Sequence, residues 1–330
     1  MHQDLLIHTE AGVTTITFNR VEKKNSFTEA MYAQLTQALS AADADAATRV
    51  LVFQGDVTVF SAGNDIGDFL NNPPANEEAV VFQFLRALVG FSKPMLAAVC
   101  GPAVGIGTTL LLHCDLVYAG DNAAFSLPFV NLGLCPEAAS SLLLPQMLGY
   151  HRAAEALLLG EPFMAEAALE VGLVNRVLPP TECNAYAQAQ AKKLAAKPLA
   201  SLVATKRLMK QGQQAATLQR IEQALRGKQG FHVVRHFCRG QRGRQRQLQL
   251  GIARLGFQRG DGGQDGGGAV ELGDGLLQAL IVAGDGCRRV AGRAMFDGRD
   301  DGGSNQVHGP PASLIHMNRM STHIAIKARQ

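Results

Sequence analysis

Two glycine-containing turns hold the residues best suited to chemistry. One spans residues 60–65 (FSAGND), and the other spans residues 101–107 (GPAVGIG) and precedes a helical run over 108–113. Glycine permits close approach of the backbone to a ligand, and N–H groups at a helix start are unpaired and partly positive. Such groups suit a substrate oxygen that gains negative charge. The spacing alone leaves open that both segments are ordinary strand-to-helix turns. Leu110 stands where a dinucleotide fingerprint needs its third glycine.

The segments around these turns alternate between strand and helix patterns. Residues 13–18 are β-branched, and the short apolar runs 50–53, 95–99 and 116–118 are typical of strands buried on both faces. Residues 27–39 repeat apolar side chains every four positions, and Ser26 with Glu29 fits a capping box before that helix. From 181 to about 225 the pattern is helical. This alternation predicts an α/β fold with right-handed crossovers.

Composition excludes several protein classes. Hydrophobic residues make up 47% of the chain, which is enough for a sizeable core. No apolar run approaches the roughly 18 residues of a membrane span, and the N-terminus has no basic region of a secretion signal. Six cysteines show no C-x-x-C pair, which indicates free thiols in a reducing compartment. We therefore expect a cytoplasmic protein without a membrane partner. We expect no metal site, because the neighbours His113, Cys114 and Asp115 do not face one another on a helix.

Four motifs in sequence order carry a resemblance to a known family. They are NRxEKKNS at 19–26, FSAGNDI at 60–66, GPAVGIG at 101–107 and FxLPFxxLGLxPE at 125–137. The chain over residues 3–225 resembles the enoyl-CoA hydratase/isomerase (crotonase) superfamily. The resemblance implies a ClpP/crotonase-like spiral of β-β-α units followed by a helical segment. It also implies an acyl-CoA thioester substrate, no cofactor beyond the CoA of that substrate, and a homotrimer or a dimer of trimers.

The resemblance predicts three domains or segments. Residues 1–190 would form the spiral core with the acyl-CoA site, and 191–225 would begin the helical oligomerisation part. Residues 226–330 hold 16 Lys+Arg against 8 Asp+Glu and 21 of the 35 glycines, which differs sharply from the rest. We interpret residues 226–330 as a disordered tail or an out-of-frame extension, and the alternative is a genuine flexible extension. Binding of single-stranded nucleic acid by this tail is disfavoured, because it has no aromatic residue between Phe257 and Phe296 on which bases could stack.

This interpretation of the tail predicts that limited proteolysis trims the chain to a core ending between about residues 215 and 235. A protease-resistant product that extends to residue 330 would contradict it.

The resemblance also implies the roles of individual residues. The two backbone N–H groups of an oxyanion hole fall on Asn64 and Ile106. The two glutamates of hydratases are replaced here by Thr109 and Phe129, and the remaining acid is Glu137, where the peroxisomal-type Δ3,Δ2-enoyl-CoA isomerases carry their catalytic glutamate. Without the resemblance, the position of Glu137 after Pro136 favours its interpretation as an acid at a helix start. The expected CoA and acyl contacts are Lys23, Lys24, Ser61, Ala62, Gly63, Asp65, Ile66, Gly105, Phe129, Leu132 and Leu134.

These residues lead to a predicted reaction. One carboxylate along the acyl chain removes a proton from C2 and returns it at C4, which converts a 3-enoyl-CoA into the trans-2-enoyl-CoA. The intermediate is a dienolate whose charge rests on the thioester oxygen, as in fatty-acid β-oxidation chemistry. The alternatives are hydration by an enoyl-CoA hydratase and acyl-CoA binding without turnover. Asp65 is expected to brace the oxyanion turn.

Overall fold

A six-stranded sheet forms the centre of the fold. The structure is a computed structural model that describes residues 3–226 except 73, 75 and 77, so the predicted tail lies outside the described residues. The strand order is β1-β2-β3-β4-β6-β9, with β1 antiparallel to β2 and every other pair parallel. The strands are β1 (Leu5–Glu10), β2 (Val13–Phe18), β3 (Val50–Gln54), β4 (Met95–Val99), β6 (Leu116–Gly120) and β9 (Arg176–Leu178).

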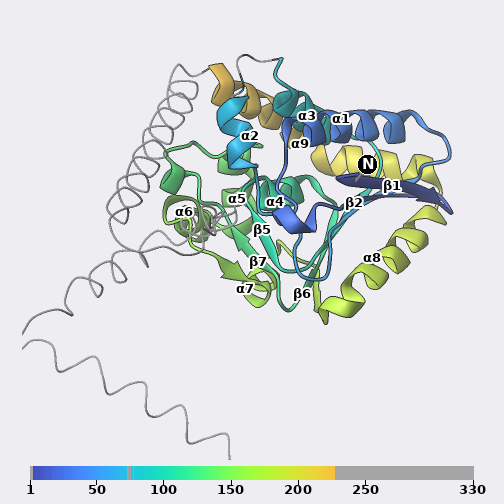
Figure 1. Cartoon of the computed structure of the whole chain (residues 1–330). Coiled ribbons are helices and arrows are strands. Elements are labelled where there is room, and N and C mark those ends of the chain that lie inside the picture. The colour runs from blue at the N-terminus through green and yellow to red at the C-terminus, as the bar shows by residue number, and fades with distance from the viewer. Residues whose placement is uncertain (1–2, 73, 75, 77, 227–330) are drawn as a thin grey trace, which may run out of the picture. The chain divides into compact units, whose positions relative to one another are not determined.

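A second, smaller sheet has three short strands, of which β5 and β7 directly follow strands of the large sheet. It has the order β5-β7-β8, with β5 (Pro102–Val104), β7 (Ala124–Ser126) and β8 (Phe163–Met164). The chain passes from β4 to β5 and then into α4 (Ile106–Thr109), and similarly from β6 to β7 and then toward α5 (Ser140–Leu148). This repeat of large-sheet strand, small-sheet strand and helix is the predicted β-β-α spiral (Figure 1).

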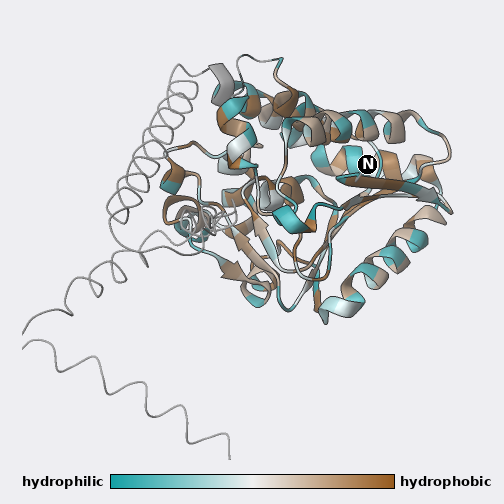
Figure 2. Cartoon of the chain, in the orientation of Figure 1, coloured by the Kyte–Doolittle hydropathy of each residue, from teal (hydrophilic) through white to brown (hydrophobic). Residues whose placement is uncertain are grey.

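Both faces of the large sheet are covered by helices. α1 (Glu29–Ala44) and α3 (Val80–Gly90) contribute to the main core, whereas α8 (Pro180–Ala195) packs on the opposite face. In β3, Leu51 and Phe53 belong to the main core, and Val50 and Val52 belong to the α8 face. This alternation confirms the prediction of strands buried on both faces. Figure 2 shows the strands mostly in apolar colours and α8 in both polar and apolar colours.

The remaining helices complete the described chain. They are α2 (Ile66–Asn71), α6 (Tyr150–Leu158), α7 (Ala165–Glu170) and α9 (Leu199–Arg226), with 3₁₀ turns η1 (Val21–Lys23), η2 (Leu110–His113) and η3 (Val130–Leu132). α8 and α9 confirm the helical pattern after residue 181. Over the described residues, none of the helices has the length and apolar character needed to cross a bilayer.

Two local predictions need correction. The N-cap of α1 is Thr28, whose hydroxyl accepts a hydrogen bond from the Met31 N–H, so the Ser26–Glu29 capping box is wrong. Ser26 is instead held by Arg20 in the neighbouring loop. The run 108–113 is not one helix: α4 is a single turn that ends at Thr109, and η2 continues it. Because α4 has only one turn, its helix dipole is small. Any stabilisation of a substrate oxygen would come mainly from the backbone N–H groups expected to act as donors, those of Asn64 and Ile106.

Candidate active site

The two glycine-containing turns lie against each other. Ser61 pairs with Ala103 in a parallel bridge: the Ser61 N–H donates to the Pro102 carbonyl at 3.0 Å, and the Val104 N–H donates to the Ser61 carbonyl at 2.9 Å. Gly63 has φ +89°, and a Cβ there would lie 2.9 Å from the Val104 carbonyl oxygen. A side chain at Gly63 would therefore be strained and would push the turns apart.

Each turn leaves one backbone donor unused. Phe27 bridges to Asn64 through the Gly63 carbonyl and the Asp65 N–H, which leaves the Asn64 N–H outside the ladder. Ile106 is the first residue of α4 after Gly105. Within the part of the chain that the structure describes, neither the Asn64 N–H nor the Ile106 N–H has a hydrogen-bond acceptor. Two unsatisfied donors on adjoining turns are the arrangement an oxyanion hole requires.

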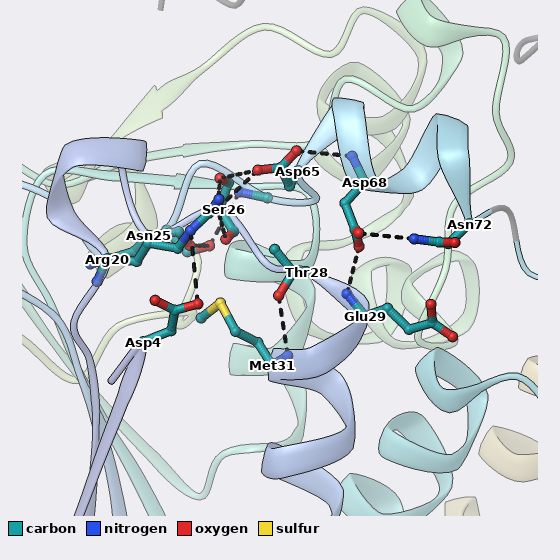
Figure 3. Close-up of polar contacts among 12 residues, drawn as sticks. Asp4, Arg20, Asn25, Ser26, Thr28, Glu29, Met31, Asp65, Asp68 and Asn72 are labelled. Atoms are coloured by element: carbon teal, nitrogen blue, oxygen red, sulfur yellow. Dashed lines mark hydrogen bonds and ion pairs between the residues drawn. The ribbon is translucent and has the colours of Figure 1, made fainter. Parts of the chain in front are cut away.

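The loop before α1 supports the first turn from below (Figure 3). Arg20 donates from Nη1 to Asp65 Oδ2 at 2.9 Å and also to the Ser26 carbonyl and hydroxyl. Asp65 also caps α2 by accepting the Asp68 N–H at 3.1 Å. Partial burial raises the pKa of Asp65, but the hydrogen bonds and the positive charge of Arg20 outweigh it, so the pKa is lowered overall. Asp65 is therefore an ionised brace, as expected, and not a proton donor.

Ser61 and Asn25 form a second, fully buried support. The Ser61 hydroxyl donates to the Asn25 carbonyl at 2.9 Å and accepts the Gly63 N–H at 3.2 Å. The Asn25 amide in turn donates to the carbonyls of Val59 and Phe60. Both hydrogen bonds of the Ser61 hydroxyl are therefore made within the protein. Ser61 would contribute to acyl-CoA binding by holding the conformation of the turn and not by contacting the ligand with its hydroxyl.

Glu137 lies opposite α4. Thr109 can donate from Oγ1 to Glu137 Oε1 at 3.5 Å, a long contact that lowers the pKa of Glu137 slightly. Glu137 keeps some accessible surface, but protein atoms crowd its carboxyl, and this desolvation raises its pKa from 4.5 to about 7. Thr109, at the position where hydratases carry a glutamate, therefore faces the Glu137 carboxyl.

Tyr32 is a site residue that the sequence analysis missed. Its hydroxyl donates a short hydrogen bond to Asn64 Oδ1. Burial and then the negative charge of Glu137 raise the pKa of Tyr32 well above its usual value, so the phenol stays protonated. Tyr32 lies on the apolar side of the predicted helix, and a buried phenol needs a hydrogen-bond partner. This position could have indicated that its hydroxyl meets a polar group of another segment.

A cavity of about 250 Å³ adjoins the Asn64 turn. It is lined by Phe27, Glu29, Tyr32, Asn64, Asp68, Phe69, Asn72, Pro74, Ala79, Val80 and Val81. Three of the expected acyl contacts, Ile66, Leu132 and Leu134, pack around Leu70 in one small apolar cluster. The cluster also contains Phe69, which lines the cavity.

The other expected contacts lie at differing depths. Phe129 belongs to the main core, and its side chain is buried there. The Lys24 carbonyl accepts the Ala62 N–H at 2.8 Å, which places η1 beside the first turn. The Lys24 side chain is exposed, and that of Lys23 is half-buried.

Comparison with known proteins agrees with this architecture. The enoyl-CoA hydratase/isomerase family profile matches residues 8–245. The chain belongs to this family. A structure of Pseudomonas aeruginosa OdaA matches with a TM-score of 0.66 and 42% identity, covering 71% of this chain and 98% of that one. The fold is therefore the crotonase fold, as the motifs predicted.

Among named relatives of this crotonase-family chain, isomerases are prominent. The chain is 40% identical over 215 residues to rat enoyl-CoA delta isomerase 2, and the match covers 63% of this chain and 55% of that relative. It is 37% identical over 205 residues to Escherichia coli 1,2-epoxyphenylacetyl-CoA isomerase, covering 60% and 78%. The chain spans about half the length of the delta isomerases it matches.

Proposed function

We propose that the chain isomerises a 3-enoyl-CoA to the trans-2-enoyl-CoA, with Glu137 as the only acid–base group. The carboxylate removes a proton from C2, the electron pair shifts toward the thioester carbonyl, and the protonated carboxyl returns the proton at C4. Only a proton and a double bond move, so the reaction needs no metal or redox cofactor. A pKa of about 7 for Glu137 supports both halves of this cycle, because such a group gives and accepts protons readily near neutral pH.

The free N–H groups of Asn64 and Ile106 would hold the dienolate oxygen. Each donor of this kind contributes about 3 kcal/mol to stabilisation of the transition state in other enzymes. Their adjacency through the Ser61–Ala103 bridge supports the assignment. The hydrogen bond from the Tyr32 hydroxyl to the Asn64 side chain helps to hold the first turn in this conformation.

The observation that carries the proposal is that Thr109 stands where hydratases carry a glutamate, so that Glu137 has no second carboxylate beside it there. Hydration uses two glutamates to position and activate water, whereas moving a double bond requires one base. Thr109 contacts Glu137, and Phe129 is buried in the main core. Neither can supply the second carboxylate. The delta isomerase names among the relatives support the same choice.

We expect the purified protein to convert 3-hexenoyl-CoA to the conjugated 2-enoyl thioester and to leave crotonyl-CoA largely unhydrated. Following the thioester absorbance with each substrate separates the candidates. Hydration of crotonyl-CoA without isomerisation would overturn the proposal. Tight CoA binding with no turnover would favour an acyl-CoA-binding protein.

We also propose that Lys23 and Lys24 contact the phosphates of CoA. Their turn lies beside the oxyanion turn through the Lys24–Ala62 hydrogen bond, and the Lys24 side chain reaches solvent. A double Lys23→Ala, Lys24→Ala variant should raise KM for the acyl-CoA with little change in kcat, and an unchanged KM would remove these lysines from the site.

The protein is further proposed to form a homotrimer or a dimer of trimers. Large apolar side chains on α6 and at its C-cap, Tyr150, Leu158 and Leu159, are exposed in a single chain. Exposed apolar side chains in one region suit a subunit contact. Light scattering after gel filtration should give three or six times the 35.1 kDa of one chain. A monomer mass would contradict this.

A further inference from the structure

The backbone immediately after Glu137 is held in an unfavourable conformation. Ala138 and Ala139 have φ values of +51° and +56°, and both are buried. Alanine lacks the short polar side chain that makes left-handed backbone tolerable for asparagine or aspartate. Two such residues in succession persist only where surrounding contacts fix them. The direction in which Glu137 leaves the main chain therefore depends on those contacts.

Most contacts that hold this turn are local. The Glu137 carbonyl accepts the Ser140 N–H at 2.9 Å and the Ser140 hydroxyl at 2.6 Å. The Ala139 carbonyl accepts N–H groups from the first turn of α5. The Ala138 carbonyl is different, because its partner is Nε2 of His113 at 3.0 Å, 25 residues earlier in the chain.

His113 is placed to act as a donor in this bond. A carbonyl oxygen only accepts, so Nε2 carries the proton. The ring is buried, and burial together with the positive charges of Lys210 and Lys206 lowers the pKa of His113 to about 4. The imidazole is therefore neutral at physiological pH. Asp115 pairs with Lys206 at 2.9 Å and with Lys210 at 3.5 Å, so its single negative charge offsets one of the two positive charges.

The segment that carries His113 is also the segment that carries the second oxyanion donor. Ile106 begins α4, and η2 continues without a break to His113. The contacts of Thr109 and His113 show that both side chains point from this segment toward the Glu137–Ala139 turn. Thr109 contacts the Glu137 carboxyl, and His113 contacts the next peptide. The backbone of His113 is held in turn by Lys210 of α9, which donates to its carbonyl at 2.8 Å.

We propose that His113 is a positioning residue that fixes the Glu137 carboxyl relative to the Ile106 N–H by tying the left-handed Ala138–Ala139 turn to η2. It touches no reacting atom. This inference rests on the proposed function for its kinetic consequence, since it assigns His113 a role through Glu137.

The test compares two substitutions of similar size. Glutamine at 113 places an amide nitrogen near the position of Nε2 and keeps the donor, whereas leucine fills the space without one. We expect His113→Leu to lower kcat at least about tenfold with KM for 3-hexenoyl-CoA within about threefold, because small misplacements of a base are costly. His113→Gln should stay within about threefold of the wild-type kcat.

A second measurement does not depend on the substrate. Carbon-13 NMR titration of the Glu137 carboxyl should give a pKa near 7 in the wild type and in His113→Gln, and a value lowered toward 4.5 in His113→Leu, as the loosened turn admits water to the carboxyl. Thr109 and Tyr32, which face this carboxyl, are unchanged in all three proteins. This titration stays decisive if the wild type fails to isomerise 3-hexenoyl-CoA, an outcome that would refute the proposed function alone.

Several results would overturn the inference. A folded His113→Leu protein with wild-type kcat and an unmoved Glu137 pKa would show that His113 only fills the core. Equal losses in the glutamine and leucine variants would show that the hydrogen bond is not what matters. Should the leucine variant fail to fold, His113→Asn replaces it, because its shorter amide stops short of the Ala138 carbonyl, and the same comparison applies.

Discussion

Replacing Glu137 with glutamine should lower kcat at least about a hundredfold while leaving affinity for the CoA product nearly unchanged. Glutamine has the same shape, and its amide oxygen can still accept from Thr109 Oγ1, so the site should keep its geometry. The amide cannot take a proton from C2, and a positioned base contributes about 10²–10⁴ in rate. The loss should therefore fall on kcat and not on binding.

A matched control for this substitution is Glu166→Gln. Glu166 is exposed in the first turn of α7, so the change removes one carboxylate from the chain outside the site. Steady-state kinetics and product binding by calorimetry on both variants decide the question. Turnover near the wild-type level in Glu137→Gln would make Glu137 an ordinary acid near a helix start.

Activity is expected to depend steeply on pH below about 7. Desolvation raises the pKa of Glu137 to about 7, so the carboxyl is protonated below that value and cannot act as a base. We expect kcat/KM to fall about fiftyfold between pH 7 and pH 5, to approach about tenfold per pH unit below about pH 6, and to level off above about pH 8. An inflection near 4.5 would show that the carboxyl is solvated and not desolvated.

The same shift predicts a stability change of opposite sense. The folded state holds the Glu137 proton more tightly than the unfolded state, where the pKa is near 4.5, so folding stability falls as pH rises from about 4.5 to about 7. The full shift corresponds to about 3 kcal/mol, and the surface that Glu137 keeps open to solvent reduces this to about 1–3 kcal/mol.

Denaturant unfolding measures this stability change directly. Glu137→Gln should be more stable than the wild type at pH 8, and the two proteins should agree near pH 4, where Glu137 is protonated in both states. A glutamine variant that is less stable at pH 8 would contradict the desolvation of Glu137.

The sequence by itself determined four strands of the large sheet, β2, β3, β4 and β6, and the positions of the two glycine-containing turns. The spiral arrangement was implied by the family resemblance. Strand signals such as 13–18 and 50–53 are local, since β-branched and apolar runs favour extended backbone wherever they occur. The glycines of the turns are also local signals, because φ +89° at Gly63 is open to few other residues. The capping of α1 by Thr28 instead of Ser26 shows the limit of such signals: neighbouring candidates compete, and Arg20 binds one of them.

Only the tertiary structure decided which polar groups meet. Tyr32 with Asn64, Thr109 with Glu137, and His113 with Ala138 are 32, 28 and 25 residues apart. Nothing in the spacing of these residues encodes the contacts. They arise because successive turns of the spiral place α1, the Asn64 turn, α4 and the Glu137 turn side by side. The raised pKa of Glu137 follows from the same packing, since desolvation depends on every atom that surrounds the carboxyl and not on its neighbours in the chain.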